Sequence, residues 1–575
     1  MLIVERKNIC KNNGLKEKVH PVLQRIYLAR GIDDPEALKP GLGHLASPKG
    51  LSGLEQAAKL VVDAIMGQRQ IVVVGDFDVD GATGVALALR ALKALGAAQV
   101  NYCVPNRFSD GYGLTPALIP PLKDKGAELV ITVDNGVSSI AGVAAARAAG
   151  MTVVITDHHL PGDTLPNAHA LVNPNLPDSG FASPHLAGVG VMFYLLAAVR
   201  QRLVQDGRLR KEQVKLSQWL DLVALGTVAD LVRLDTNNRI LVAQGLARIR
   251  AGRCAEGISA LCRIAGRDQG RLGAADLGFA LAPRLNAAGR LSDMSTGIEC
   301  LLTDDPGRAA DLAAQLQELN SERRSVQADM EAEAQAIVEG LPGSPGNTAG
   351  HSLCLYEAGW HQGVVGLVAS RVKDRWHRPV VAFAPEDAGS DVLKGSARSI
   401  AGFHIRDALA LVAARHAGLI HRFGGHAMAA GLTLPAAHLE AFSEALEAVA
   451  AEQLAPEQLR QVVRTDGPLA GSDLNLDLAW QLAEGGPWGQ GFPEPQFDNQ
   501  VRVVTLRGVG RGHTRLSVAI DDVEVEAIAF NMDPDRVRAM GTALRMLYAL
   551  EVNEYRGQQS VQLRVNHLLP LSSAS

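Results

Sequence analysis

The chain has 575 residues, of which 47% are hydrophobic and 20% are charged, and its formal net charge is −5. This length exceeds what one hydrophobic core supports, so we expect roughly two to four domains of ordinary globular composition. The mild negative charge excludes a molecule that attracts nucleic acid over its whole surface. Any such binding must use a local basic groove.

Compartment and membrane signals come from the cysteines and the apolar runs. The six cysteines are scattered and form no CxxC pair, which argues against a disulfide framework or a zinc ribbon and favours a reducing cytoplasm. The opening segment MLIVERKNICKNNG is charged and lacks an apolar stretch, so we expect no secretory signal. The longest apolar run, 186–199, is too short to span a bilayer and predicts a buried helix, with no membrane partner.

An α/β pattern begins after a lead-in over residues 1–50. We predict helices over 53–68, 81–96 and 141–150, and strands over 70–77, 99–105, 128–133 and 151–156. Continuous Val and Ile runs are typical of strands covered on both faces, and strand–helix alternation predicts a parallel, doubly wound sheet. We assign residues 51–305 to this domain.

The rest of the chain changes pattern twice. Residues 306–340 are rich in helix formers and predict one long bridging helix, although a helix packed within one domain is the alternative. We assign 306–345 to this helix and a Gly/Pro/Ser linker, and 346–455 to a mixed α/β domain. Within 456–575, alternating runs over 497–508, 513–522 and 523–530 predict a small antiparallel barrel or sandwich.

Carboxylates follow the first predicted strand in the segment GDFDVDG, residues 75–81. Asp76, Asp78 and Asp80 lie where the strand gives way to a helix that starts at Gly81. Ligands of open α/β sheets bind beyond the carboxyl ends of strands, and three close carboxylates repel one another unless cations neutralise them. An EF-hand loop starts similarly, but a helix precedes it and a Glu closes it. The segment therefore predicts a metal site.

Two further strands end in candidate ligands. Strand 128–133 is followed by Asp134, and strand 151–156 by Asp157, His158 and His159. Taken singly, Asp-Asn-Gly is a common turn and a histidine pair can lie on any surface. Three successive strands that deliver such residues to one sheet edge favour a shared site. Asp230 is a fourth candidate, although a lone Asp after an apolar helix is more often a cap.

This set offers more ligands than one divalent ion needs. Mixed oxygen and nitrogen ligands suit Mn²⁺ or Mg²⁺ better than zinc. Two divalent ions are a common device for displacement at phosphorus, because they activate a water and clamp the charge that develops on the phosphoryl oxygens. The sequence therefore predicts a two-metal site for Mn²⁺ or Mg²⁺.

The segments GDFDVDG, VDNG, TDHH and GTVAD resemble the four motifs of the DHH phosphoesterase superfamily. HRFGGHAMAAGL, residues 421–432, resembles the glycine-rich motif of the associated DHHA1 domain. PRLNAAGRL, GWHQGVVGLVASR, GSARS and GPWGQGFPEP are similar to segments of its single-stranded-DNA-specific exonucleases. The resemblance implies a DHH domain over 51–305, a DHHA1 domain over 346–455 and an OB-fold-like domain over 456–575.

The same resemblance implies a 5′→3′ exonuclease that hydrolyses single-stranded DNA to 5′-mononucleotides in recombination and repair. It implies a helicase and a single-strand-binding protein as partners, and we expect a monomer. A DHH-type phosphodiesterase for small molecules or short oligonucleotides is an alternative, disfavoured by chain length and the extra β domain. An inactive DNA-binding scaffold is another, disfavoured because every candidate ligand is retained.

Roles for single residues also follow from the resemblance. The implied metal ligands are Asp78, Asp80, Asp134, His158 and Asp230, with Asp76 either a ligand or a residue that orients one. His159 would contact the scissile phosphate and could donate a proton, and Asp157 would hold an imidazole in its ligating tautomer. His426 would lie at the facing wall of the active cleft with Gly424 and Gly425, although alone it is more often a structural histidine.

Recognition of the 5′ end needs a phosphate clamp. Arg107 and Tyr112, and likewise Ser396 and Arg398, pair an arginine with a hydroxyl beside glycines, whereas a single exposed arginine is more often solvated. The implied contacts to backbone phosphates are Arg284, Asn286 and Arg290. The candidate stacking or core aromatics are Phe108, Tyr112, Phe423 and Trp488. Arg502, Arg507, Arg511 and Arg515 would form a basic or merely solvated strand face.

Overall fold

The computed structural model describes the chain except for residues 1, 108–109, 341–349, 388, 511 and 572–575. The chain divides into two compact units. The large unit comprises Val4–Gln317 and Arg464–Ser575, and the small unit comprises Glu318–Val463 with the first residues of the chain. Among the described residues, no helix combines the length and apolar character needed to cross a membrane.

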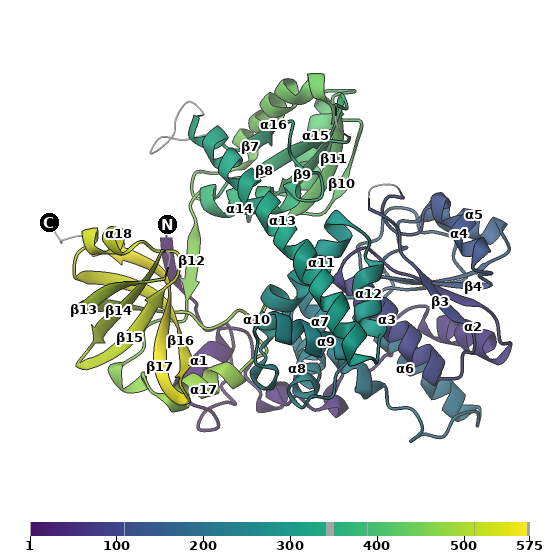
Figure 1. Ribbon diagram of the computed structural model, residues 1–575, viewed down its shortest axis with the longest axis horizontal. Helices are drawn as coiled ribbons and strands as arrows, with labels where there is room; N and C mark the ends of the chain where they lie inside the picture. The colour runs from purple at the N-terminus through teal and green to yellow at the C-terminus, as the bar shows by residue number, and fades with distance from the viewer. Residues whose placement is uncertain (1, 108–109, 341–349, 388, 511, 572–575) are drawn as a thin grey trace. The chain divides into compact units, whose positions relative to one another are not determined.

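A five-stranded parallel sheet forms one end of the large unit (Figure 1). Its order is β3-β2-β4-β5-β6, with bounds β2 Ile71–Val74, β3 Val100–Cys103, β4 Leu129–Val133, β5 Thr152–Thr156 and β6 Ala170–Val172. Helices α2 (Leu54–Met66), α3 (Val79–Ala94) and α6 (Gly188–Gln205) cover one face, and α4 (Ile119–Asp124) and α5 (Ile140–Ala148) cover the other. Because β2 and β4 are buried at every position, the prediction of a doubly wound parallel sheet is confirmed.

Helix α3 begins two residues before the predicted start at Gly81. Asp78 is its N-cap, and the Asp78 side chain accepts a hydrogen bond from the Gly81 backbone N–H at 3.1 Å. Capping by a carboxylate satisfies a backbone donor that the first helical turn leaves free. The cap therefore places Asp80 inside the first turn of the helix rather than in the preceding loop.

A series of helices follows the parallel sheet in the large unit, and the last of them continues into the small unit. The earlier ones are α7 Leu220–Ala229, α8 Thr236–Arg250, α9 Glu256–Ile264, α10 Ala274–Asp276, α11 Ala282–Leu291 and α12 Ser295–Leu302. A π-helical turn, Leu277–Leu281, precedes α11. Helix α13 (Pro306–Gly340) then runs for 35 residues, and the division between the units falls within it. The predicted long bridging helix is confirmed.

The small unit contains a mixed sheet of order β10-β11-β9-β8-β7. Its strands are β7 Leu353–Tyr356, β8 Val380–Pro385, β9 Val392–Arg398, β10 Arg422–Gly425 and β11 Ala429–Pro435. Its helices are α14 Val365–Trp376, α15 Ile405–Arg415 and α16 Leu439–Gln453. Strands β7 and β8 are parallel and the other pairs are antiparallel. Phe383, Phe403 and Phe442 lie in its core, which α15 and α16 help to form.

The C-terminal strands close into a barrel of order β13-β14-β15-β17-β16, which decides between the predicted barrel and sandwich. Its strands are β13 Phe497–Val509, β14 His513–Ile520, β15 Val523–Ala529, β16 Ala543–Tyr555 and β17 Gln558–Pro570. The sequence pattern identified only the first three. Helix α17 (Leu476–Glu484) precedes the barrel, and α18 (Pro534–Ala539) interrupts it.

The N-terminal segment is attached to the chain just before the barrel. Strand β1 (Leu2–Glu5) pairs with β12 (Val462–Thr465), and α1 (Pro21–Leu28) follows. The Tyr27 ring stacks on Trp488 and on Phe492, with centroids 6.2 and 6.3 Å away. The Arg30 guanidinium lies 2.7 Å from the carboxylate of Asp466, and both side chains are almost fully buried. These contacts join segments more than 400 residues apart.

Candidate metal centre

Neighbouring strands of the parallel sheet deliver polar residues to one edge. Asp76 follows β2, Asp134 follows β4, and Asp157 follows β5. The chain passes from β2 to β3 on one side and then to β4 on the other, so the strand order reverses at β2. Ligands of open α/β sheets bind at such a reversal. The predicted residues therefore share the usual position for a ligand site.

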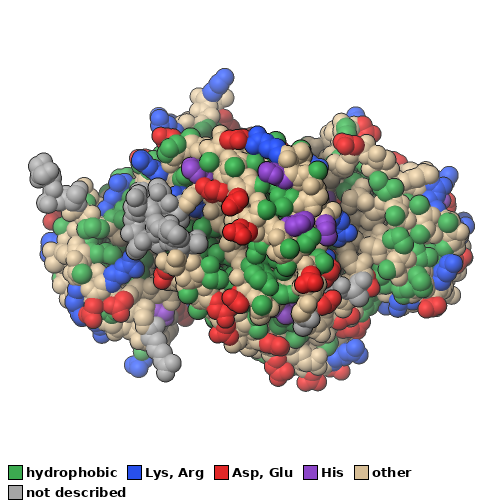
Figure 2. Space-filling model, turned by 90° about the horizontal axis from the view of Figure 1, so that it is seen from above, with side chains coloured by type: hydrophobic (Ala, Val, Ile, Leu, Met, Phe, Trp, Pro, Cys, Tyr) green, Lys and Arg blue, Asp and Glu red, His purple; other side chains and the backbone are tan. Residues whose placement is uncertain are grey.

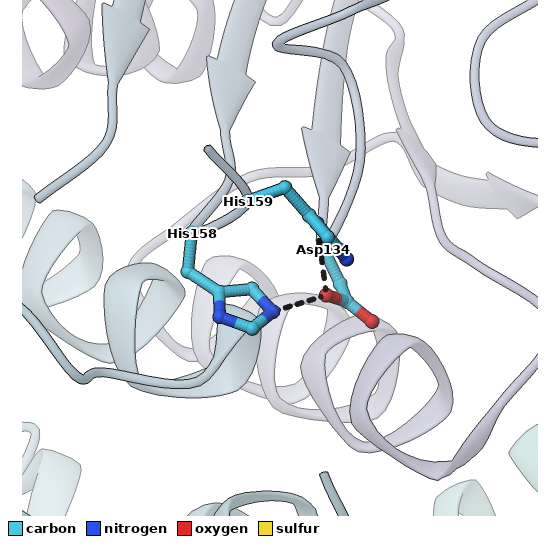
Figure 3. A group of neighbouring side chains, drawn as sticks. All are labelled: Asp134, His158 and His159. Carbon is cyan, nitrogen blue, oxygen red and sulfur yellow. Dashed lines mark hydrogen bonds and ion pairs between the residues drawn. The ribbon is translucent and has the colours of Figure 1, made fainter. Parts of the chain in front are cut away.

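The six predicted metal ligands lie together. Their ligand atoms, together with those of His159, form overlapping groups within 4.8 Å, namely Asp76–Asp78–Asp134, Asp80–His158–Asp230 and Asp134–His158–His159. His158 Nε2 lies 3.0 Å from a carboxylate oxygen of Asp134 (Figure 3), 3.5 Å from one of Asp230 and 3.9 Å from one of Asp80. Asp230 caps the C-terminal end of α7, yet its carboxylate points into this cluster.

Helix α6 holds Asp80 from the other side of the site. The two Asp80 oxygens accept hydrogen bonds from the backbone N–H groups of Gly188 and Val189 at 2.6 and 2.8 Å. The N-terminus of a helix favours a negative charge. Residue 188 must be a glycine, because a Cβ there would lie 2.5 Å from the Cβ of Asp134. The sequence interpretation missed this contact, since 108 residues separate Asp80 from Gly188.

The carboxylates are buried and repel one another. Burial, followed by the charge of neighbouring aspartates, raises the pKa of Asp76, Asp134 and Asp230 well above the ordinary value, and that of Asp80 to about 7. Asp76 Oδ1 is buried and has no hydrogen-bond partner among the described residues. A divalent cation would supply both the missing partner and the missing positive charge, so these residues fit a metal site.

His159 differs from His158 in its partners. Its Nδ1 lies 2.8 Å from Asp157 Oδ1, and the other Asp157 oxygen accepts from the Val137 N–H at 2.8 Å. Burial alone would lower the pKa of His159, but the hydrogen bond and charge of Asp157 outweigh burial and raise it to about 9. Conversely, His159 holds the pKa of Asp157 below its usual value despite burial. His159 is therefore held in an ion pair at the edge of the metal cluster.

Two of the predicted phosphate-binding residues adjoin this cluster. The Tyr112 hydroxyl donates to the backbone carbonyl of Asp134 at 3.0 Å and lies 3.3 Å from the His159 ring nitrogens. The Arg107 guanidinium lies over the Phe77 ring, 4.0 Å from its centroid. Burial lowers the pKa of Arg107, although the charges of nearby aspartates oppose that effect. Phe108 lies outside the described residues.

Helix α11 carries the three residues predicted to contact backbone phosphates. Asn286 Oδ1 accepts from the Val79 backbone N–H at 3.2 Å, so this side chain supports the start of α3. Arg284 Nε donates to Gln317 Oε1 at 2.8 Å. Arg290 is partly buried in the last turn of α11. The structure thus gives Asn286 a structural contact, with a residue 207 positions away, that the sequence did not suggest.

The remaining predicted substrate residues lie in the small unit. On β9, Arg398 Nη1 donates to Ser396 Oγ at 3.0 Å and to the Ala397 carbonyl at 2.8 Å. Burial lowers the pKa of Arg398, and both of these hydrogen-bond partners are neutral. Gly424 and Gly425 end β10, and the exposed His426 follows with its backbone N–H donating to the Ala429 carbonyl at 2.8 Å.

Two of the predicted stacking aromatics pack against other side chains of the protein. Phe423 packs against the core of the small unit. Trp488 stacks on Phe492, with ring centroids 4.9 Å apart, and also contacts the Tyr27 ring. Its Nε1 donates to the Leu482 carbonyl at 2.8 Å. In the barrel, Arg515 pairs with Glu526 across neighbouring strands. Arg502 and Arg507 lie exposed on β13, and Arg511 lies outside the described residues.

Two asparagines at the sheet edge also escaped the sequence interpretation. Asn173 and Asn175 follow β6, and their side chains donate to the backbone carbonyls of His159 and His158. The segment Asn173-Pro174-Asn175 could have been recognised as the fourth strand ending at this edge, but strand β6 has only three residues. A three-residue strand gives too weak a pattern for prediction from sequence.

Three family models match the chain. They are the DHH family N-terminal domain over residues 70–227, the DHHA1 domain over 349–452 and the RecJ OB domain over 465–567. The chain is 49% identical to the "Single-stranded-DNA-specific exonuclease RecJ" of Dickeya dadantii, over 98% of this chain and 99% of the relative. It is 46% identical to the Escherichia coli protein of the same name, over 99% of each chain.

A solved structure agrees with these sequence matches. The fold is similar to that of "RecJ in complex with Mn2+" from Thermus thermophilus, with a TM-score of 0.81 and 29% sequence identity. That match covers 100% of this chain and 80% of the other. Sequence identity, fold and the composition of the site agree, and the chain belongs to the RecJ family of DHH phosphoesterases.

Proposed function

We propose that this chain is a 5′→3′ exonuclease that hydrolyses single-stranded DNA to 5′-mononucleotides in recombination and repair. The observation that carries the proposal is the cluster of five aspartates and His158 at the sheet edge, where several carboxylates are buried with raised pKa values. Sequence similarity over nearly the full length of relatives that are named single-stranded-DNA-specific exonucleases supports the substrate class.

The cluster would hold two Mn²⁺ or Mg²⁺ ions. The proposed ligands are Asp76, Asp78, Asp80, Asp134, His158 and Asp230. Ions bound there would lower the pKa of an attacking water and neutralise charge on the phosphoryl oxygens. Asp134 and His158 each belong to two of these groups of ligand atoms, so both would take part in holding the ions. The backbone N–H groups at the N-terminus of α6 hold the Asp80 carboxylate in place.

A second set of residues would act on the phosphate itself. His159 is held by Asp157 and adjoins the cluster, so it can contact the scissile phosphate and hold a proton for the leaving oxygen. His426 and the glycines Gly424 and Gly425 leave an exposed strand end that a phosphodiester backbone can approach. Asp157 is a positioning residue, because it touches the imidazole rather than the substrate.

Digestion in the 5′→3′ direction requires a site that recognises the 5′ end of the DNA. Ser396 and Arg398 suit a 5′-phosphate, because the buried Arg398 guanidinium donates to the neutral Ser396 hydroxyl and Ala397 carbonyl and would gain by meeting an anion. Arg107 and Tyr112 adjoin the metal cluster and suit the phosphate nearest to it. On α11, the proposed contacts to the following backbone phosphates of the DNA strand are Arg284, Asn286 and Arg290. We also propose the domain boundaries 51–305, 346–455 and 456–575.

The surface agrees with local rather than general binding of DNA. Figure 2 shows Lys and Arg side chains scattered among acidic and neutral ones on one face, not gathered into one basic field. With a net charge of −5, affinity for DNA would come from the residues proposed above to contact phosphate and from the barrel, rather than from a long-range field. A helicase and a single-strand-binding protein as partners, a monomeric state and a cytoplasmic location stay predictions from the resemblance and the cysteine pattern.

The test is digestion of single-stranded DNA that carries a label at either the 5′ or the 3′ end, with Mn²⁺ present. We expect immediate release of 5′-labelled mononucleotide, late release of the 3′ label, and no digestion of blunt duplex. Substituting Arg398→Ala should abolish the preference for a 5′-phosphate over a 5′-hydroxyl. Turnover of dinucleotides without attack on long strands would contradict the proposal and favour the small-molecule alternative.

A further inference from the structure

Two asparagine side chains donate hydrogen bonds to the backbone of the adjacent histidines His158 and His159. Asn175 Nδ2 donates to the His158 carbonyl at 2.5 Å, and Asn173 Nδ2 donates to the His159 carbonyl at 2.8 Å. The Asn175 backbone N–H in turn donates to Asn173 Oδ1 at 2.8 Å, which ties the Asn173 side chain to the backbone of Asn175. Asn173 is fully buried. We refer to Asn173 and Asn175 as the asparagine clamp.

The opposite side of the same backbone is held by Asp157. Its Oδ1 accepts from the backbone N–H groups of His158 at 2.7 Å and His159 at 3.1 Å. The peptide group between the two histidines is therefore fixed at both ends, by Asp157 at its N–H and by Asn175 at its carbonyl. Because a peptide group is planar, these bonds restrict the backbone torsions on either side of it. The directions in which the two side chains leave the backbone are restricted with them.

This restriction matters because the two rings have different tasks. The ring of His158 meets Asp134 (Figure 3). The ring of His159 meets Asp157, and the centroids of the two rings are only 4.5 Å apart. A rotation of the shared peptide would move both rings at once.

We propose that the asparagine clamp positions the histidine pair, so that His158 is presented to the metal ions and His159 is kept for the phosphate. The inference rests on the proposed function for the assignment of His158 as a ligand. Amide side chains suit this task because they are uncharged and keep donating whatever the occupancy or ionisation of the site. Residues that orient a ligand from outside its coordination sphere tune metal affinity as well as turnover.

The test uses Asn175→Asp in the full-length, metal-free protein. Aspartate keeps the size of the side chain but replaces the donor with an oxygen that faces the His158 carbonyl. We expect calorimetric titration with Mn²⁺ to give an affinity weaker by about 10- to 100-fold, the usual effect of removing such an orienting contact. Asn175→Gln keeps the amide donor and should restore part of the affinity.

A matched control separates positioning from general structural damage. Asn499 Nδ2 donates to the Leu469 carbonyl at 2.9 Å in the barrel, so Asn499→Asp removes an equivalent contact there and should leave Mn²⁺ affinity unchanged. Thermal unfolding in EDTA reports any loss of stability for both variants. The inference is overturned if Asn175→Asp binds Mn²⁺ like the wild type, or if Asn499→Asp weakens binding as much. Failure of the wild type to bind Mn²⁺ would instead overturn the proposed function, and the clamp's role with it.

Discussion

Asp80→Asn should reduce the pH dependence of the stability of the metal-free protein. In the folded chain, burial and the charge of Asp78 raise the pKa of Asp80 from 3.8 to about 7. A carboxyl group with a raised pKa gives its full stability below its unfolded pKa, and that stability is lost as the pH rises through the folded pKa. The unfavourable interaction of the ionised Asp80 therefore develops between about pH 4 and pH 7.

The size of the effect follows from the shift in pKa. Each pKa unit corresponds to about 1.36 kcal/mol, so ionisation of Asp80 should cost about 3 kcal/mol between pH 5 and pH 8. Asparagine does not titrate and removes this cost. It also leaves one of the two N–H groups on α6 without an acceptor, which lowers stability by about 1–2 kcal/mol at both pH values. The difference between the two pH values isolates the titration.

The assay is thermal unfolding in EDTA at pH 5 and pH 8. For the large unit, a change of about 1 kcal/mol in the free energy of unfolding shifts the midpoint temperature by roughly 1 °C. On going from pH 5 to pH 8, the midpoint of the wild type should therefore fall by about 3 °C more than that of Asp80→Asn. Asp522→Asn, at an exposed turn of the barrel, should behave like the wild type. Equal pH dependence in wild type and Asp80→Asn would refute the reasoning that these carboxylates are held together against their repulsion.

Three further changes test the fold and the site. Asp466→Asn leaves Arg30 buried without its carboxylate and should lower the free energy of unfolding by about 3 kcal/mol, measured by urea denaturation. Gly188→Ala places a methyl group 2.5 Å from the Asp134 Cβ, and calorimetry should give Mn²⁺ affinity weaker by about 10-fold or more. Glu447→Gln removes a carboxyl group whose pKa is lowered, despite opposing burial, by hydrogen bonds from backbone N–H groups. Such a carboxyl stabilises the folded chain above its unfolded pKa. Thermal unfolding should therefore show the wild type to be more stable than Glu447→Gln above about pH 4.5, and this difference should be lost at lower pH.

Local patterns predicted the parts of the fold that depend on neighbours in sequence. Val-rich strands followed by Asp76, Asp134 and Asp157 identified the parallel sheet and its ligand edge, because parallel strands end at the same edge. The long helix was predictable for the same reason, since it has helix formers throughout. Asp230 was a candidate from the sequence, although a lone Asp after an apolar helix is more often a cap, and the resemblance favoured its role as a ligand.

The contacts that the sequence did not reveal join distant segments. Nothing near Asp80 indicates that its partners are the N–H groups of α6, and nothing near Trp488 indicates that Tyr27 stacks on it. Trp488 was a candidate stacking residue because exposed and buried aromatics look alike in sequence. Strands β16 and β17 were not identified individually, although their pairing with β13 and β15 closes the barrel.

We propose that the carboxylate and imidazole cluster around Asp134 hydrolyses DNA. The most direct measurement is release of mononucleotides from a 5′-phosphorylated single-stranded oligonucleotide, with Mn²⁺ added to metal-free wild type and to Asp134→Ala. We predict that the wild type becomes active only when Mn²⁺ is added, and that Asp134→Ala stays inactive at every Mn²⁺ concentration while unfolding at a similar temperature in EDTA. Full activity of Asp134→Ala, or of the wild type in EDTA, would contradict the claim.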